Sequence, residues 1–487
     1  MKLKKLLKDS SLVKWTGHPD ENIKGISYSS KQVKPHYLFA ALKGEKTDGN
    51  NFIQEALKKG ATAVLSENPP PPNFSFCWIQ VKEAREALAR ISANFYSHPS
   101  REIKMVGITG TKGKTTLTYL LEAILEKAHC SPSLIGTIHY KGPHSEVSAQ
   151  RTTPEAPDLQ KMLREMKNQG ATHGIVEVSS HALELKRVVG IEFDIVVFTN
   201  LSGEHMDYHK SMDRYFEAKK KLFSLNPEGM SVINLDDPWG KKLISQLPKG
   251  VITYGLETPA LIHADDYDFT QRGIHMSVTY PAGKIHLSSP LLGKPNASNL
   301  LASVACALTL NIPVSAIKSG IASLSEIPGR LEKIENSLGL LIFVDYAHTD
   351  EALRGLLKTA QELRPRKILL VFGAGGDRDK SKRPRMGEVA GTYADLTILT
   401  SDNPRSENPM DIISDIQKGL NKTGCKDYQI QLNRRKAIQK ALSLAEKGDC
   451  ILVAGKGHEN EQIIQDKVFP FNDSEVIRDT LNKMEAS

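Results

Sequence analysis

The chain has 487 residues, of which 40% are hydrophobic and 25% are charged, and its formal net charge is +8. This composition is typical of a globular protein that folds in water, and the length predicts about three domains at roughly 150 residues each. The positive charge is not gathered into a long basic run or a basic strip with aromatic residues, which favours anionic small substrates over nucleic acid.

The five cysteines are scattered and include no C-x-x-C pair, so the sequence gives no sign of a disulfide framework or a zinc site. The first eight residues lack the apolar core of a signal peptide, and no apolar stretch approaches the roughly 20 residues that span a bilayer. We therefore expect a cytoplasmic protein with neither a membrane nor a nucleic-acid partner.

A first block, residues 1–100, ends near His98-Pro99-Ser100. Buried strands are predicted beyond it, at 103–108, 174–179, 195–199 and 231–235, and again at 341–345, 367–372, 396–400 and 450–454. Apolar runs that alternate with helical patterns are typical of parallel sheets covered by helices on both faces. The predicted fold class is therefore α/β.

A glycine-rich loop, Gly-Ile-Thr-Gly-Thr-Lys-Gly-Lys-Thr-Thr at 107–116, joins the first of these strands to a helical segment. In such a loop, backbone N–H groups face phosphate oxygens, a lysine reaches the phosphates and a threonine hydroxyl meets magnesium. The general pattern G-x-x-x-x-G-K-[ST] needs glycine where this chain has Ile108, but Gly110, Gly113, Lys114 and Thr115 are present. We predict a nucleoside triphosphate site; the alternative is a glycine-rich turn without a ligand.

Polar and glycine-rich clusters follow several of the predicted strands. They lie at 179–181 and 200–205 in the middle of the chain, and at 345–348, 373–378, 401–405 and 455–459 in the last third. Open parallel sheets bind their ligands at the carboxyl ends of the strands. We therefore expect two sites, one in each parallel-sheet block, that face each other across a cleft.

Two of these clusters contain residues that suit a metal. Magnesium prefers oxygen ligands, and Glu177 near Thr115 would meet that need. His205 follows another strand end, but histidine is a less usual ligand for magnesium, and a lone histidine there is more often a capping or hydrogen-bonded loop residue.

Lys219 lies in a predicted helix at 215–223, within a run of charged residues that is usually a solvated face. The i, i+3, i+4, i+7 spacing of Phe216, Lys219, Lys220 and Phe223 nevertheless places Lys219 on the apolar side.

The last block contains groups that would recognise an amino acid. Asp402-Asn-Pro-Arg405 combines a turn with a guanidinium group, whose two parallel N–H groups match a carboxylate. Arg378 would supply a second guanidinium group. Glu459 would complement an ammonium group. Each of these residues is equally well explained, taken alone, by an ordinary salt bridge in a loop.

Together these motifs resemble the Mur ligases, and within that family the MurE type, along essentially the whole chain. The resemblance is carried by the loop at 110–116, Thr152-Thr-Pro-Glu155, Glu177-Val-Ser-Ser-His181, Thr199–His205, Lys219, Asn296 and Asn299, Gly329-Arg-Leu-Glu332, Asp345–His348, Gly375–Lys380, Asp402–Arg405 and Gly455–Glu459. It implies three domains. These are a small N-terminal α/β domain for the UDP substrate (1–100), a central P-loop-type parallel-sheet ATPase domain (101–328) and a C-terminal Rossmann-like domain for the amino acid (329–487).

The resemblance also implies an activity. It is the ATP-dependent addition of meso-2,6-diaminopimelate to UDP-N-acetylmuramoyl-L-alanyl-D-glutamate through an acyl phosphate, in peptidoglycan precursor synthesis. The residues that match the family's catalytic positions are Lys114, Glu177, His205 and Lys219, the last of them carbamylated; Thr115, Glu177, His205 and Lys219 would place Mg²⁺.

Binding residues carry over in the same way. The ATP positions are Gly110, Thr111, Gly113, Lys114, Thr115, Thr116, Asn299, Arg330 and Asp345. The UDP-substrate positions are Ser30, Thr152, Thr153, Ser179 and Arg187, and the amino-acid positions are Arg378, Asp402, Asn403, Arg405, Gly455 and Glu459.

The chain departs from the family pattern at Ser29-Ser30-Lys31, where an Asp-Ser-Arg motif is usual, and at Asn50, where histidine is usual. We expect a monomer. Three alternatives stay open: the same reaction with L-lysine, a ligase like folylpolyglutamate synthetase, and a P-loop ATPase that acts as a switch.

Overall fold

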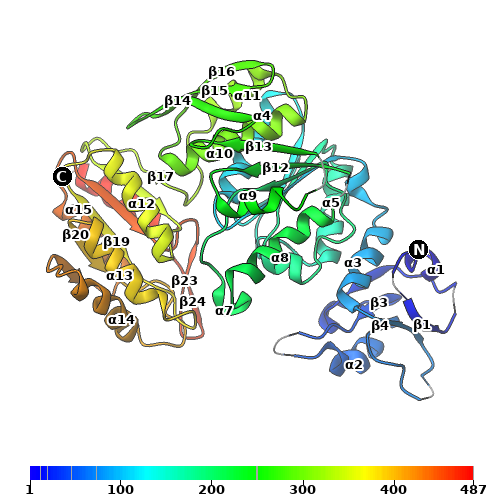
Figure 1. Cartoon of the computed structure of the whole chain (residues 1–487). Helices are drawn as coiled ribbons and strands as arrows, with labels where there is room; N and C mark the ends of the chain where they lie inside the picture. Colours follow the sequence, from blue (N-terminus) through cyan, green and yellow to red (C-terminus); the bar gives the residue numbers. More distant parts are fainter. Residues whose placement is uncertain are drawn as a thin grey trace. The chain divides into compact units, whose positions relative to one another are not determined.

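The computed structural model describes residues 1–10, 12–18, 20–44, 47–72, 74–226, 228–247 and 250–485, apart from the side chain of Asp207. The chain divides into two compact units, each of which is described by itself. Unit 1 comprises Met1–Leu201, Asp213–Thr253 and Ala305–Pro313, and unit 2 comprises Ser202–Met212, Tyr254–Val304 and Val314–Ser487. Figure 1 shows the elements along the chain.

Unit 1 begins with a five-stranded sheet in the order β1-β5-β4-β3-β2, in which only β1 is antiparallel to its neighbour. Its elements are α1 (Leu3–Leu6), β1 (Leu12–Thr16), β2 (Gly25–Ser27), β3 (Tyr37–Ala40), α2 (Ile53–Lys58), β4 (Ala61–Ser66), β5 (Cys77–Val81) and α3 (Ala84–Phe95), with 3₁₀ turns at Ser30–Gln32 and Gly49–Phe52. Leu38, Leu65 and Ile79 of the strands pack against Leu88 and Ile91 of α3 and form its core.

A second sheet of unit 1 carries the glycine-rich loop. Its strands run in the order β12-β11-β6-β10-β7-β8-β9; those from β12 to β7 are parallel, whereas β8 and β9 are antiparallel hairpin strands. The elements are β6 (Lys104–Thr109), α4 (Lys114–Lys127), β7 (Pro132–Ile135), β8 (His139–Gly142), β9 (Ser145–Ser148), α5 (Ala156–Asn168), β10 (His173–Glu177), α6 (Ser180–Glu184), β11 (Ile195–Phe198), α8 (Met212–Ser224), β12 (Met230–Asn234), α9 (Pro238–Ile244) and β13 (Val251–Gly255), with a 3₁₀ turn at Pro99–Arg101. Because β6, β10 and β11 are adjacent and parallel, the segments that follow them meet at one edge of the sheet.

Unit 2 contains the short helix α7 (Met206–His209) and an antiparallel ribbon of β14 (Ile262–Thr270), β15 (Gly273–Tyr280) and β16 (Gly283–Ser289). The helices α10 (Lys294–Thr309) and α11 (Val314–Ser323) follow. This ribbon was not predicted from the sequence, because its strands are not continuous apolar runs: β14 contains three aspartates, and in β16 exposed and buried residues alternate.

The six-stranded sheet of unit 2 has the order β17-β18-β22-β19-β20-β21 and is parallel apart from β17. Its elements are β17 (Glu332–Lys333), β18 (Leu341–Asp345), α12 (Asp350–Glu362), β19 (Ile368–Phe372), α13 (Lys382–Tyr393), β20 (Leu396–Leu399), α14 (Pro409–Lys422), β21 (Tyr428–Ile430), α15 (Arg434–Leu444), β22 (Cys450–Ala454), the hairpin β23 (Glu461–Ile464) and β24 (Lys467–Pro470), and α16 (Asp473–Glu485).

Helices cover this sheet on both faces. Leu353 of α12, Met386 of α13 and Ile416 of α14 belong to one buried cluster, while Ile438 of α15 and Ile477 of α16 belong to another. The apolar strands predicted in the last block are therefore buried by helices on both faces of the sheet, as strands without polar positions require. All eight buried strands predicted from the sequence are present, as β6, β10, β11, β12, β18, β19, β20 and β22.

Candidate functional site

The glycine-rich loop of unit 1 joins β6 to α4, as predicted. Gly110 has a φ of +150°, and a Cβ there would overlap the Thr199 hydroxyl. Gly113 has a φ of +86° and stands at the cap position of α4. Asn200 holds the loop from the next strand end, because its side chain accepts from Lys112 N at 2.9 Å and donates to Lys112 O at 3.1 Å. The loop is thus a fixed turn whose backbone leads into a helix N-terminus, which is the geometry that binds phosphate.

Lys114 is the first residue of α4 and lies over this turn. Its ammonium donates to Gly110 O at 2.9 Å and to Thr111 O at 3.0 Å. Thr111 and Thr116 are each 6% exposed, and Thr111 Oγ1 lies 3.3 Å from the Tyr215 hydroxyl. The lysine is therefore held beside the loop carbonyls, at the N-terminus of α4.

Glu177 ends β10 and is 1% exposed. Its carboxylate accepts three hydrogen bonds, from Thr137 N at 3.0 Å, Thr137 Oγ1 at 2.8 Å and Thr115 Oγ1 at 3.1 Å. Among the residues that the structure describes, no lysine, arginine or histidine pairs with it. A buried carboxylate that only neutral groups contact has no protein cation beside it in the described residues, and its oxygens are the ligand type that Mg²⁺ prefers.

Lys219 of α8 is 1% exposed, so the solvated-face interpretation of its charge run is wrong for this residue. Its ammonium donates to Gly110 O at 2.8 Å and lies 4.5 Å from the centroid of the Tyr215 ring. The apolar-side position that the helical spacing predicted is confirmed, and it brings the lysine onto the phosphate loop.

Four of the five predicted UDP-substrate residues, Thr152, Thr153, Ser179 and Arg187, form one chain of contacts with Glu177. Thr152 Oγ1 lies 3.1 Å from Thr137 Oγ1, Thr153 Oγ1 donates to Glu177 O at 2.7 Å, and Ser179 N donates to Thr153 Oγ1 at 3.1 Å. Arg187 Nη1 donates to Thr153 O at 3.0 Å.

Arg187 also pairs with Glu155, at 2.7 Å between Nη2 and Oε1. Arg151 and Arg85 contact the same carboxylate at 2.7 Å and 3.6 Å, so three guanidinium groups surround a single negative charge. The excess positive charge suits an anionic substrate group. Ser30 lies elsewhere, in the first sheet's domain, where its hydroxyl donates to Glu55 Oε2 at 2.9 Å.

The remaining predicted nucleotide and metal residues lie in unit 2. His205 has a φ of +59° at the start of α7, and its Nε2 is 3.8 Å from Glu204 Oε1, which is also 3.5 Å from His348 Nε2. Asn299 Nδ2 donates to Asn296 Oδ1 at 3.3 Å in α10.

Arg330 and Asp345 lie close to each other at the end of β18. The guanidinium of Arg330 stacks on the Tyr346 ring at 4.7 Å, and Asp345 accepts from Leu331 N at 2.7 Å and Ala347 N at 2.8 Å. Burial raises the pKa of the Asp345 carboxyl, against the lowering effect of Arg330. The side chain is thereby fixed as part of the turn that follows the strand.

Four of the predicted amino-acid residues come together at the ends of β20 and β22. Asn403 Nδ2 donates to Glu459 Oε2 at 2.8 Å, and Asp402 Oδ1 accepts from Asn403 N at 2.6 Å. A Cβ on Gly455, whose φ is +116°, would come within 2.5 Å of Asp402 Oδ2. Glycine is therefore needed there both for its backbone conformation and for the close approach of the aspartate.

Arg405 is held in place by hydrogen bonds, whereas Arg378 is exposed to solvent. Arg405 has a φ of +50°, its Nη1 donates to Gly376 O at 2.8 Å, and its backbone N donates to Ile463 O at 3.1 Å in β23. Arg378 is exposed, and within the described part of the chain it makes no hydrogen bond or ion pair.

Comparison with known families agrees with this arrangement. Three family models match the chain: the Mur ligase family, catalytic domain over residues 22–96, the Mur ligase middle domain over 108–307, and the Mur ligase, glutamate ligase domain over 329–457. The chain belongs to the Mur ligase family. The resemblance read from the motifs is confirmed.

Relatives within the Mur ligases are similar over nearly their whole length. A UDP-N-acetylmuramoyl-L-alanyl-D-glutamate–2,6-diaminopimelate ligase of Caldanaerobacter subterraneus subsp. tengcongensis is 43% identical, with 96% of this chain and 97% of the relative covered. An enzyme of the same name from Geobacter metallireducens is 42% identical, with 93% of each chain covered.

A solved structure with that name superposes with a TM-score of 0.70 at 30% identity and covers 100% of both chains. The predicted fold class, α/β with the three Mur ligase domains, is confirmed. The exact domain boundaries at 100 and 328 stay a prediction.

Sequence reasoning missed three residues of this Mur ligase site. Thr137 contacts Glu177 through both its backbone and its side chain, but it follows β7 without any motif, so only the folded sheet reveals it. Glu155 and Lys456 both lie inside quoted motifs. For Lys456 the signal in the sequence was its position directly after an apolar strand, inside the motif Gly455–Glu459, whereas its burial is seen only in the structure.

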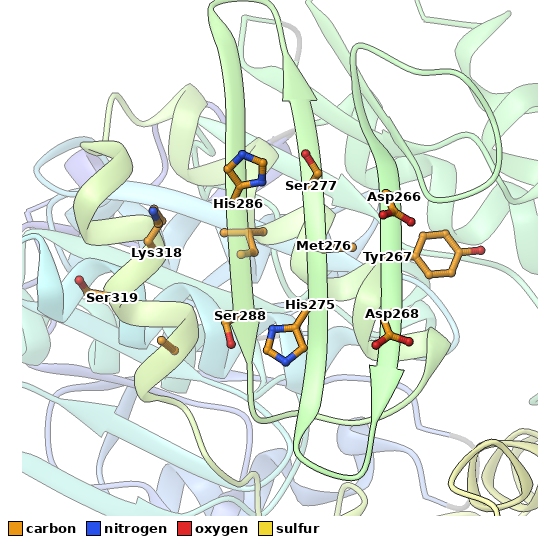
Figure 2. A pocket seen from close by; sticks show the side chains of 12 residues that line it. Asp266, Tyr267, Asp268, His275, Met276, Ser277, His286, Ser288, Lys318 and Ser319 are labelled. Atoms are coloured by element: carbon orange, nitrogen blue, oxygen red, sulfur yellow. The ribbon is translucent and has the colours of Figure 1, made fainter.

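One hollow on the surface of this Mur ligase lies away from all of these residues (Figure 2). It has a volume of about 750 Å³ and lies over the exposed face of β14–β16, beside α11. Asp268, His275, His286 and Lys318 line it, so its charges are mixed. In the described ranges no group of three or more His, Cys, Asp or Glu could hold a metal, and no helix is long and apolar enough to cross a membrane.

Proposed function

We propose that this Mur ligase joins meso-2,6-diaminopimelate to UDP-N-acetylmuramoyl-L-alanyl-D-glutamate with ATP, in peptidoglycan precursor synthesis. The observation that carries the proposal is the likeness, over nearly the whole chain, to enzymes that bear this name. We place the UDP substrate on residues 1–100, ATP on 101–328 and the amino acid on 329–487. We further propose that it acts as a monomer in the cytoplasm.

The phosphate loop supports the ATP part of the proposal. Lys114 is held within 3.0 Å of the loop carbonyls, beside the N-terminus of α4, and needs only to turn its ammonium toward the β- and γ-phosphates. We assign the phosphates to Gly110, Thr111, Gly113, Lys114, Thr115 and Thr116, and the adenosine part to Asn299, Arg330 and Asp345.

The residues around Glu177 fit a magnesium ion. Both the Glu177 carboxylate and the Thr115 hydroxyl offer oxygen, 3.1 Å apart and buried, and the carboxylate carries no cationic partner within the described chain. We propose that these two residues hold Mg²⁺, with His205 and a carbamylated Lys219 placing a second ion. When bound, the metal neutralises phosphate charge; a carbamate would give Lys219 the negative charge that this role needs.

ATP is required because a carboxylate is a poor acyl donor at neutral pH. An oxygen of the D-glutamyl carboxylate attacks the γ-phosphorus, the bond to the β,γ-bridging oxygen breaks, and ADP leaves. The nitrogen of the amino acid then attacks the acyl carbon, loses a proton and expels phosphate. Thr152, Thr153, Ser179 and Arg187 would orient the acceptor substrate, and Lys114 would offset the charge that develops on the transferred phosphoryl group.

The cluster around Asn403 supports an amino acid as the third substrate. Glu459 is 30% exposed at its side chain and can accept an ammonium group, while the guanidinium of Arg405 or Arg378 can take a carboxylate. We propose that Asp402, Asn403, Arg405, Gly455 and Glu459, with Arg378, select diaminopimelate over L-lysine through its additional carboxylate.

Phosphate release with each substrate omitted in turn tests the function. We expect release only when ATP, the UDP-dipeptide and diaminopimelate are all present, and much slower turnover with L-lysine. A switch ATPase would hydrolyse ATP without the amino acid. A ligase like folylpolyglutamate synthetase would not use the UDP-dipeptide, and faster turnover with L-lysine would refute the assignment of specificity.

A further inference from the structure

Lys456 is a fully buried lysine at the centre of the amino-acid cluster, and nothing in the proposed function uses it. It follows Gly455 at the end of β22, and its side chain is 0% exposed. Its ammonium donates to Asn403 Oδ1 at 3.1 Å and to Glu459 Oε2 at 2.9 Å. A buried ammonium group is costly unless it is paired, so this one is held by the two residues it contacts.

The ammonium closes a ring of hydrogen bonds. Asn403 Oδ1 accepts from Lys456 and from Ile463 N at 3.0 Å, while Asn403 Nδ2 donates to Glu459 Oε2 at 2.8 Å. If the amide were rotated by 180°, its NH₂ group would face two donors. Lys456 therefore sets the orientation of the Asn403 amide, which in turn fixes one oxygen of Glu459.

The same contacts decide what Glu459 offers to a ligand. Oε2 is engaged twice, by Lys456 and by Asn403, which leaves Oε1 as the oxygen without a bond to the cluster. The nearby ammonium also offsets part of the carboxylate charge. Glu459 thus presents one fixed carboxylate oxygen to an ammonium group. A carboxylate without these two contacts could rotate and accept a cation from several directions.

We propose that Lys456 is a positioning residue for the incoming amino acid, which locks Asn403 and Glu459 in the geometry that receives its ammonium group. The inference rests on the proposed function. Lys456 acts on binding of the amino acid alone, because neither of its partners belongs to the phosphate loop.

Kinetics of Lys456→Met tests the inference, since methionine keeps the volume and removes the donors. We expect the KM for meso-diaminopimelate to rise by about tenfold or more, with the KM for ATP within twofold of wild type. Lys456→Arg, which keeps the charge, should recover part of the loss. The exposed ion-pair lysine Lys422, which contacts Glu388, provides the control variant Lys422→Met, for which we expect no change.

A double variant distinguishes a positioning role of Lys456 from a nonspecific loss of structure. If Lys456 acts through Asn403, Lys456→Met combined with Asn403→Ala should raise the KM no further than the worse single variant. An unchanged KM in Lys456→Met, or fully additive effects, overturns the inference while leaving the function intact. If Lys456→Met does not fold, Lys456→Gln takes its place with the same criteria. A wild-type protein that forms no amide with diaminopimelate overturns both.

Discussion

Replacing Thr137 by valine tests the account of the Glu177 site. The change keeps the shape of the side chain and the backbone bond from Thr137 N, but it removes the 2.8 Å hydroxyl bond to a carboxylate that is 1% exposed. A hydrogen bond to a buried charged group contributes about 1.5–3 kcal/mol. We therefore expect unit 1 to lose about 2 kcal/mol, which lowers its unfolding temperature by roughly 4–8 °C for a unit of this size.

Tryptophan fluorescence during heating measures this loss, because all three tryptophans lie in unit 1 and one of them, Trp239 of α9, belongs to the part of the unit whose sheet carries Glu177. A signal that comes from unit 1 alone is needed, because a chain of several domains does not unfold in one two-state step. Thr172→Val is the matched control: Thr172 is also hydrogen-bonded in unit 1, to Ser131, but it is exposed, and we expect a shift below about 2 °C. Equal shifts in the two variants would refute the view that Glu177 is a buried charge held by neutral donors.

Three further variants test the phosphate loop, the role of Lys219 and an ion pair of unit 2. Lys114→Ala should abolish phosphate release, and near-normal turnover would contradict the assignment of the phosphate loop. Lys219→Ala should be inactive but regain part of its activity with short carboxylic acids that replace the carbamate; full activity without them would exclude its metal role. The bond from Arg383 lowers the pKa of Glu407 to about 2, so its stabilising effect is complete above the ordinary pKa of about 4.5 and is lost as the pH falls toward 2. The unfolding temperature of Glu407→Gln, measured from pH 6 to pH 2, should therefore approach that of wild type in acid, whereas a constant difference would contradict the pairing.

Local sequence predicts the parts of the site that are continuous in the chain. The strand–loop–helix around residues 104–127 and the position of Lys219 on its helix follow from periodicity and glycine placement, and both are present. Thr137 could not be predicted in this way, because its contact with Glu177 spans 40 residues and depends on β7 and β10 being neighbours. Pairing between strands is a property of the whole sheet, not of either segment.

The ribbon β14–β16 shows a second limit. Its strands mix polar and apolar residues, with strict alternation of exposed and buried positions in β16, and a search for continuous apolar runs cannot detect them. Lys456 shows a third: a lysine in a glycine-rich loop is normally exposed, and only the packing of Asn403 and Glu459 around it accounts for its burial.

Two glutamates of this protein differ in the groups that surround their carboxylates. Glu177 is held by two threonines, and no described lysine, arginine or histidine pairs with it, which suits the Mg²⁺ that we propose there. Glu459 shares an oxygen with a buried ammonium, so the attraction it offers is weaker and directional. On the proposed function, a substrate ammonium group would meet that single oriented oxygen with one N–H, whereas Glu177 and Thr115 would offer Mg²⁺ two buried oxygens 3.1 Å apart.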